Sequence, residues 1–176
     1  MEFITLQTER LILRGISPEV YDYAFHLPEN ETREFFGFST NIQLDLERKR
    51  YEGGLRTFNK TFLYFQLIDK KSDAIMGWCG FHTWYTDHDR AELGYGLYSD
   101  YFKRQGFMSE AIPTILEYGF NEMNLHRIEA FASARNTPSI KLLASNNFKK
   151  EGVLMEHYLI DGVYEDSEVY AVIKSN

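Results

Sequence analysis

The sequence predicts a mixed α/β domain: one central mixed β-sheet of about seven strands, with about four helices on its faces. Two observations indicate this class. In the middle of the chain an amphipathic helical pattern stands between two strand patterns, an order typical of parallel strands joined by a crossover helix. On either side, strand patterns separated by short polar turns predict antiparallel pairs. The 176 residues fit one domain, expected over residues 8–174.

The first third of the chain is expected to supply one strand and two helices. Residues 3–14 end in an alternating pattern of apolar side chains, which predicts a strand. Ser17 and Pro18 resemble an N-cap and the first residue of a helix. Residues 28–40 are polar and are expected to form a loop. Apolar residues on one side predict a second helix over 41–59.

The middle of the chain predicts three antiparallel strands and a crossover unit. The strand patterns cover 62–68, 74–82 and 91–98, with polar turns between them. Apolar side chains then recur at helical spacing over 107–121, and residues 126–133 form the next strand pattern. Because a helix of crossover length joins the strands at 91–98 and 126–133, these two strands are expected to pair in parallel.

The remaining elements follow from proline and glycine positions. Pro113 lies inside the crossover helix and is expected to kink it or to open its first turn, because proline lacks an N–H. Residues 137–145 begin with Thr-Pro and predict a short helix. The last two strand patterns, 148–159 and 163–173, are joined by Asp-Gly, a dipeptide typical of tight hairpin turns.

Composition and charge argue against several classes of function. With 19 basic and 26 acidic side chains the net charge is −7, which argues against nucleic-acid binding. Cys79 is the only cysteine, so no internal disulfide is expected, and no Cys/His spacing predicts a metal site. Cys79 lies in an apolar strand pattern and is interpreted as a buried thiol. No apolar run is long enough for a membrane span, so we expect a cytoplasmic protein.

The segment KRQGFMSEA at 103–111 carries the most informative pattern. A strand pattern runs into a basic turn with a glycine, and this turn opens the best helical pattern of the chain. The first backbone N–H groups of a helix have no partner within it, and the helix dipole favours an anion there. We therefore predict a phosphate-binding loop. Its expected members are Lys103, Arg104, Gln105, Gly106, Phe107, Met108 and Ser109.

Four segments resemble one known family in their order and spacing. They are TERLILR at 8–14, ELGYGLYSDYFKRQGFMSEAI at 92–112, NTPS at 136–139 and GVYEDSEVYAVI at 162–173. Together they are similar to the GNAT N-acetyltransferases, and look most like the branch of bacterial enzymes that acetylate serine or alanine at ribosomal-protein N-termini. The resemblance implies the GNAT fold, with acetyl-CoA bound where two parallel strands splay apart.

The resemblance also implies how the cosubstrate is held. The family motif for the diphosphate, Gln/Arg-x-x-Gly-x-Gly/Ala, falls on Lys103, Gly106 and Met108. Methionine departs from the motif and is expected to place a larger side chain beside the phosphate arm. Binding is expected to survive, because backbone N–H groups make the main contacts.

A bulge in the strand before this loop is expected to aim one N–H at the thioester oxygen. The resemblance places it around Tyr95, Gly96 and Leu97, where the pantetheine arm pairs with backbone. Gly94 and Gly96 permit a bulge and a close backbone approach. The alternative is that both glycines only relieve crowding in the sheet.

For the leaving group, the resemblance implies roles for two residues after the next strand. Asn136 is expected to hydrogen-bond the pantetheine arm, and Ser139 is the candidate that protonates or hydrogen-bonds the CoA sulfur. The alternative for Ser139 is a polar residue in a first helical turn. Many GNAT enzymes carry a tyrosine four residues later, and that position is Leu143 here.

The general base is expected on the penultimate strand, where the ribosomal-protein branch has a glutamate before a Tyr-Leu pair. In this chain His157 stands before that pair and Glu156 precedes it, so both are candidates. Neighbouring strand residues face opposite sides, so at most one should face the cleft unless a bulge intervenes. The alternatives are that His157 is an ordinary strand residue and that water takes the proton.

The sequence therefore predicts an acetyl-CoA-dependent N-acetyltransferase in which the amine attacks the thioester directly. The first candidate acceptor is a protein N-terminus, and the alternative is a small amine such as a polyamine, an amino acid or an antibiotic. A non-catalytic acyl-CoA-binding sensor is a further alternative, favoured by the missing tyrosine. Glu92 is expected either to contact the incoming amine or to be solvated. The resemblance is compatible with a homodimer.

Overall fold

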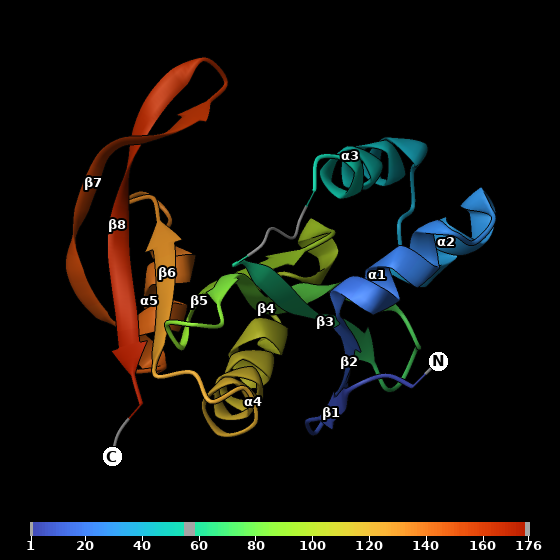
Figure 1. Cartoon of the computed structure of the whole chain (residues 1–176), viewed down its shortest axis with the longest axis horizontal. Coiled ribbons are helices and arrows are strands. Elements are labelled where there is room, and N and C mark those ends of the chain that lie inside the picture. Colours follow the sequence, from blue (N-terminus) through green and yellow to red (C-terminus); the bar gives the residue numbers. More distant parts are fainter. Residues whose placement is uncertain (1, 55–58, 175–176) are drawn as a thin grey trace.

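The computed structural model describes residues 2–54 and 59–174, which form one open sheet of eight strands with five α-helices. Across the sheet the strands follow the order β1-β2-β3-β4-β5-β6-β8-β7 (Figure 1). This confirms the predicted class, a mixed sheet flanked by helices. The elements are β1 (Thr5–Gln7), β2 (Leu11–Ile16), α1 (Pro18–Phe25), α2 (Glu29–Phe36), α3 (Asn41–Glu52), β3 (Thr61–Asp69), β4 (Ile75–Tyr85), β5 (Arg90–Leu97), a 3₁₀ turn (Asp100–Phe102), α4 (Phe107–Asn121), β6 (Arg127–Ala132), α5 (Thr137–Ser145), β7 (Lys149–Ile160) and β8 (Val163–Ile173).

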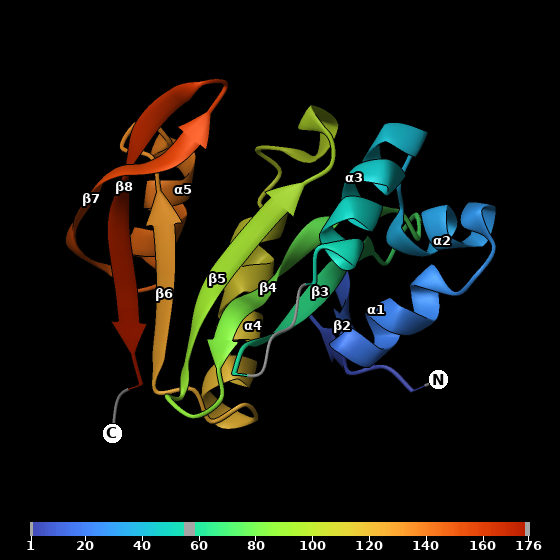
Figure 2. The same cartoon turned by 45° about the horizontal axis from the view of Figure 1, so that its top comes forward.

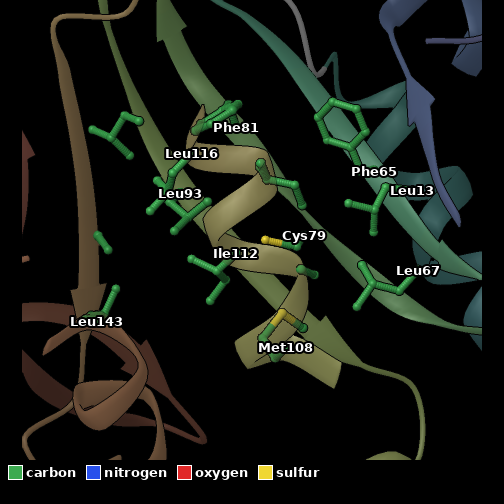
Figure 3. Close-up of a cluster of buried hydrophobic side chains, with 14 of the residues drawn as sticks. Leu13, Phe65, Leu67, Cys79, Phe81, Leu93, Met108, Ile112, Leu116 and Leu143 are labelled. Carbon is green, nitrogen blue, oxygen red and sulfur yellow. The ribbon is translucent and has the colours of Figure 1, made fainter. Parts of the chain in front are cut away.

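The helices cover both faces of the sheet. Helices α4 and α5 share a buried apolar cluster with the central strands (Figure 3). Helices α1, α2 and α3 lie on the other face, over a second cluster that is rich in aromatic rings (Figure 2). The buried side of α4 follows the helical spacing that the sequence predicted. Its members are Phe107, Met108, Ala111, Ile112, Ile115, Leu116 and Gly119.

Strands β5 and β6 are parallel, as predicted, but they pair only at their beginnings. Residues Arg90, Ala91 and Glu92 lie opposite Arg127, Ile128 and Glu129. Beyond these pairs β5 stays bonded to β4 and β6 to β8, and the two strands diverge (Figures 1 and 2). The facing strand edges past this point therefore present backbone N–H and C=O groups that no strand satisfies.

Residues 3–14 form a hairpin, so the single strand expected there is wrong. Strands β1 and β2 pair antiparallel, with Thr5 opposite Arg14. Thr8 closes the turn between them: its N–H donates to Leu11 O at 3.0 Å, and its Oγ1 accepts from the Leu11 N–H at 3.0 Å. Hydroxyl bonds of this kind replace backbone bonds and reverse the chain. The hairpin brings the sheet to eight strands.

The expectation of a loop over residues 28–40 is also wrong, because α2 lies there. Thr32 and Phe36 are its buried positions, one helical turn apart, and Gly37 ends the helix at φ 73°. A helix that buries so few side chains shows little apolar periodicity in the sequence, and it depends on tertiary packing.

Two further helices differ in detail from the prediction. Helix α3 starts at a capping box of Thr40 and Gln43 and ends at Glu52, whereas the predicted helix continued to 59; residues 55–58 lie outside the described residues. Helix α4 runs without a break through Pro113, so the expected opening of its first turn is wrong. Pro113 is exposed, and its ring therefore leaves the buried face undisturbed.

The C-terminal hairpin β7–β8 turns at Asp161 and Gly162, as predicted, with φ of 49° and 80°. It extends beyond the rest of the sheet (Figure 1), and most of β7 is exposed. Several of its apolar side chains face solvent. They are Val153, Leu154, Met155, Tyr158, Leu159, Ile160, Val163 and Tyr164.

Substituting Gly77 with alanine is expected to destabilise the sheet by about 2–3 kcal/mol, because β4 and β5 approach too closely there for a side chain. An added Cβ would lie 2.2 Å from Gly96 O and 2.8 Å from Leu97 Cα, both backbone atoms. Urea unfolding measures the change. Gly152→Ala is the matched control, since nothing lies within 4 Å of its Cβ position; equal stabilities of the two variants would contradict the prediction.

Candidate active site

The loop before α4 contains two residues with the left-handed backbone that occurs in anion-binding nests. Arg104 and Gly106 both lie in the left-handed region, with φ of 60° and 80°. Gly106 is the N-cap residue and has no side chain with which to cap the helix. The first N–H groups of α4, on Phe107, Met108 and Ser109, therefore remain available for an anion, and the helix dipole adds to them.

The side chains of this loop divide between core and solvent. Phe107 and Met108 are buried in the core, at 9% and 7% exposure. Figure 3 shows Met108 among the buried side chains. The expectation that the Met108 side chain lies beside the phosphate arm is therefore wrong, because the helix turns it inward and leaves only its N–H at the loop. The exposed members are Lys103, Arg104, Gln105 and Ser109.

Strand β5 has a regular register at the residues expected to bulge, so that expectation is wrong. Pairing with β4 continues from Leu97, opposite Gly77, to Glu92, opposite His82. The register shift in this pair of strands lies beyond it, between His82 and Tyr85.

Gly94 serves packing instead, in line with the crowding alternative. A Cβ on Gly94 would lie 2.8 Å from His82 Nε2 and 2.9 Å from Trp78 Cη2, so the glycine makes room for two rings. The edge of β5 toward β6 is still open past Glu92. The assignment of its backbone to pantetheine stays a prediction, for Tyr95, Gly96 and Leu97.

Ser139 contacts a tyrosine on β5, whereas the family pattern places a tyrosine on α5. Its Oγ lies 2.6 Å from the Tyr95 hydroxyl, and burial raises the pKa of Tyr95. Leu143, the position of the family tyrosine, is fully buried in the core. Asn136 caps α5 by accepting the Ser139 N–H on Oδ1 at 3.2 Å. The hydroxyl pair thus links β5 to the start of α5, across the diverging strands.

The two expected bases lie at a bulge on the exposed strand β7. The register with β8 shifts between Leu154 and Tyr158, and Glu156 lies in the left-handed region at φ 49°. His157 is exposed, and its ring centroid lies 5.2 Å from that of Phe131 on β6. The bulge removes the simple alternation of sides that would have separated the two residues. Their role as bases stays a prediction.

Glu92, to which the sequence assigned no definite role, has an unusual environment. Burial raises its pKa to about 7, and the charge of Glu129, opposite it on β6, adds to the rise. Its Oε1 lies 3.6 Å from His82 Nε2. Burial lowers the pKa of His82, so a neutral imidazole stands beside this carboxyl at neutral pH. The sequence predicted that these two strands pair in parallel. It did not give their register, and the register places Glu92 opposite Glu129.

A pocket of about 360 Å³ opens beside this pair, on the face covered by α1, α2 and α3. His82 forms part of its wall. The charged residues of the pocket are Glu47 and Arg50 of α3, which pair at 3.2 Å, and the Tyr21 hydroxyl donates to Glu47. Aromatic rings make up most of the rest. The remaining lining residues are Ile16, Phe36, Phe38, Tyr64, Gln66, Trp78 and Tyr98.

Comparison with known proteins decides the family. A family model described as an acetyltransferase (GNAT) domain matches residues 10–149. The chain belongs to the GNAT acetyltransferase family. It is also 33% identical over 186 aligned positions to the uncharacterized N-acetyltransferase p20 of Bacillus licheniformis, covering 97% of this chain and 96% of that protein. The predicted family and the predicted enzyme class are therefore confirmed.

Relatives of this GNAT N-acetyltransferase carry names with different acceptors. The [ribosomal protein uS5]-alanine N-acetyltransferase of Escherichia coli is 31% identical over 123 residues, covering 68% of this chain and 63% of that protein. A solved structure of a spermidine/spermine N-acetyltransferase from Vibrio cholerae has a TM-score of 0.67 at 20% identity, covering 93% of this chain and 92% of that one. The latter shows a shared fold.

GNAT acetyltransferases use acetyl-CoA, and the residues of this enzyme fit such a cosubstrate. The N-cap at Gly106 leaves the start of α4 open to a diphosphate, and the unpaired edge of β5 suits an extended pantetheine arm. Within residues 2–54 and 59–174, no group of three His, Cys, Asp or Glu side chains could hold a metal ion. In the same residues, no helix is both long and apolar enough to cross a bilayer.

If the Tyr95–Ser139 pair is the proton donor for the departing thiolate, removing either hydroxyl is expected to lower kcat of this GNAT enzyme by about tenfold or more. The KM for acetyl-CoA should change much less. Thiol-release kinetics of Ser139→Ala and Tyr95→Phe measure both quantities, with Ser145→Ala at the other end of α5 as the control. If the hydroxyls act as one unit, the double variant will be no slower than the slower single variant. Unchanged kcat in both single variants would exclude the role.

Proposed function

We propose that this enzyme acetylates the N-terminal amine of a protein, with ribosomal proteins as the first candidates. The observation that carries the proposal is the position of Glu92 and His82, where the ring-lined pocket approaches the diverging strands. An N-terminal residue can place its nitrogen beside Glu92 and its side chain in the pocket. The relative that acts on the alanine of uS5 supports this acceptor class.

In the proposed reaction Glu92 takes the proton that the ammonium group must lose, directly or through His82. A carboxyl with a pKa near 7 is well matched to that transfer at neutral pH. The freed lone pair attacks the thioester carbonyl, so that an N–C bond forms. A backbone N–H on the open edge of β5 donates to the carbonyl oxygen as it gains charge. The C–S bond then breaks, and the Tyr95–Ser139 pair supplies a proton to the sulfur. The attacking nitrogen, which carries a positive charge after the attack, releases its second proton as the amide forms, and a proton from water restores the pair.

A small polycationic amine is the second candidate acceptor. Glu47 lies in the ring-lined pocket, and a carboxylate among aromatic faces suits a second cation. Arg50 neutralises Glu47 in the free protein, but its side chain is 64% exposed. Because such exposed ion pairs are weak, a cationic ligand can displace it. The spermidine/spermine acetyltransferase with the same fold supports this class.

Thiol release from acetyl-CoA with a panel of amines tests the proposal. The panel contains peptides that begin with alanine or serine, the same peptides with blocked N-termini as matched controls, free amino acids and spermidine. We expect release with the free peptides and none with the blocked ones. Release with spermidine alone would favour the second candidate. CoA binding by calorimetry without release from any amine would favour a non-catalytic acyl-CoA sensor.

We also propose that the enzyme forms a homodimer through the β7–β8 hairpin. The hairpin exposes apolar side chains that an isolated chain would leave in water, including Leu159 at 59% and Val163 at 62% exposure. Light scattering should then give about twice the chain mass of 20.7 kDa. Leu159→Lys should reduce this mass to that of one chain, and a monomeric wild type would contradict the proposal.

A further inference from the structure

The turn between β1 and β2 holds the first turn of α4. Glu110 of α4 accepts three hydrogen bonds there: Thr8 Oγ1 and the Arg10 N–H donate to Oε1 at 2.5 and 2.7 Å, and Arg10 Nε donates to Oε2 at 2.6 Å. These bonds connect residues about one hundred positions apart in the chain. Both oxygens of one carboxylate are therefore committed to a single turn of the N-terminal hairpin.

Arg10 also reaches the phosphate loop itself. Its Nη1 donates to Gln105 O at 3.0 Å, and its guanidinium lies 4.5 Å from the ring centroid of Phe107. On the side of Gly106 where a Cβ would stand, the nearest atom is Arg10 Nη2, 3.5 Å from that position. One side chain thus lies against three consecutive residues of the loop.

Arg10 and Glu110 form an ion pair at neutral pH. Burial alone would raise the pKa of Glu110, but the hydrogen bonds from Thr8 and Arg10 outweigh it and lower the pKa. The carboxylate is therefore ionised at neutral pH. The Glu110 side chain is 18% exposed and that of Arg10 is 41% exposed, so the contact depends on the three hydrogen bonds to Glu110 and not on the attraction of the charges alone.

The loop needs such support because its backbone is strained and its residues are exposed. Arg104 adopts φ 60°, in the left-handed region that is unfavourable for a residue with a side chain. Residues 103–106 bury no side chain that would hold this shape. If a loop becomes ordered only when the ligand binds, the free energy of ordering reduces the affinity. A loop that is already ordered in the free protein avoids this reduction.

We propose that Thr8, Arg10 and Glu110 form a brace that keeps the loop at 103–106 in the shape that receives the diphosphate of CoA. The three are positioning residues: they act through the loop and not on the reacting atoms. This inference rests on the proposed binding of the diphosphate at the start of α4. It also gives a physical role to the TERLILR segment, whose first three residues build the turn.

The test compares two acyl donors, acetyl-CoA and S-acetylpantetheine, which lacks the diphosphate. For Arg10→Gln and Glu110→Gln we expect kcat/KM with acetyl-CoA to fall about tenfold, while kcat/KM with S-acetylpantetheine changes less than about twofold. The calorimetric Kd for CoA should rise by the same factor as the first loss. Arg48→Gln is the matched control, because Arg48 also forms an ion pair with a glutamate and is 42% exposed, against 41% for Arg10.

The outcomes separate the brace from a general effect on folding. An equal loss with both donors would assign Arg10 and Glu110 a structural role only and overturn the proposal, as would an unchanged Kd for CoA. Arg10→Lys keeps a cation near Glu110 without the bond to Gln105 O, so an intermediate Kd is expected; it serves also if Arg10→Gln fails to fold. A wild type that binds no CoA would instead refute the proposed function.

Discussion

Replacing Glu92 with glutamine is expected to lower kcat by about 10²- to 10⁴-fold, since Glu92 is the group that takes the proton of the amine in the proposed reaction. In the wild type, kcat/KM should rise with pH up to about 7, as Glu92 loses its own proton, and then level off. In Glu92→Gln this inflection should disappear. Rate measurements between about pH 5.5 and about 9, with varied acceptor and saturating acetyl-CoA, provide kcat and kcat/KM.

Glu129→Gln is the matched control for this prediction. It removes the neighbouring charge that helps to raise the pKa of Glu92, so the inflection should move below pH 7 while activity remains. If Glu92→Gln keeps both the rate and the pH profile of the wild type, then another group is the base. His157 and Glu156 on the bulge of β7 are the next candidates.

Glu92→Gln should also be more stable than the wild type at alkaline pH. The folded-state pKa of Glu92 lies above its ordinary value, so the folded state binds more protons and its stability falls as pH rises through about 7. Glutamine cannot ionise, and Glu92→Gln should therefore gain about 1–3 kcal/mol at pH 8 and little at pH 4. Urea unfolding at the two pH values measures this difference. Replacing a catalytic group often makes a protein more stable while it lowers the activity.

Gly106→Pro is expected to weaken the affinity for CoA by at least about 100-fold. Gly106 lies at φ 80°, proline is fixed near −65°, and the substitution also removes one N–H. The loss corresponds to one or two charge-assisted hydrogen bonds to the diphosphate. Calorimetry with CoA measures it. The melting temperature should also fall, because proline cannot adopt this φ, but the chain should still fold, because the residue is exposed.

Two alanine variants separate the loss of the nest from simple backbone strain. Gly106→Ala strains the backbone at this positive φ but keeps the N–H, so it should bind CoA with intermediate affinity. Gly54→Ala pays a similar penalty at φ 81°, far from the loop in sequence and with open space around it, and should bind CoA like the wild type. Unchanged affinity in Gly106→Pro would refute the assignment of the diphosphate to this helix end.

Local patterns in the sequence predicted the elements whose causes are local. The long apolar stripe gave α4, and Asp161-Gly162 gave the C-terminal hairpin. Elements that depend on distant contacts were missed. Helix α2 buries only Thr32 and Phe36 and looks polar in the sequence, and the β1–β2 turn relies on the hydroxyl of Thr8.

The candidate site divides in the same way. Glycine in a basic turn before a helix is a local signal, and it predicted both the helix start at Phe107 and a phosphate-binding role for the loop, which stays a prediction. Whether Met108 turns toward the loop or the core depends on the phase of α4 against the sheet, and it turns to the core. The contact of Tyr95 with Ser139 depends on how β5 and α5 are juxtaposed, which no spacing in the sequence reveals.

The chain's own pattern of apolar side chains, glycines and caps determined the class of fold, the crossover between parallel strands and the glycine-capped start of α4. These features arise from hydrogen bonds and side-chain periodicity within a few residues. Folding in three dimensions decided the rest: it set Glu92 against Glu129 and His82, raised a carboxyl pKa by burial, and brought Arg10 to a loop about one hundred residues away. Burial and register are properties of the assembled sheet, and they exist only once distant segments have packed together.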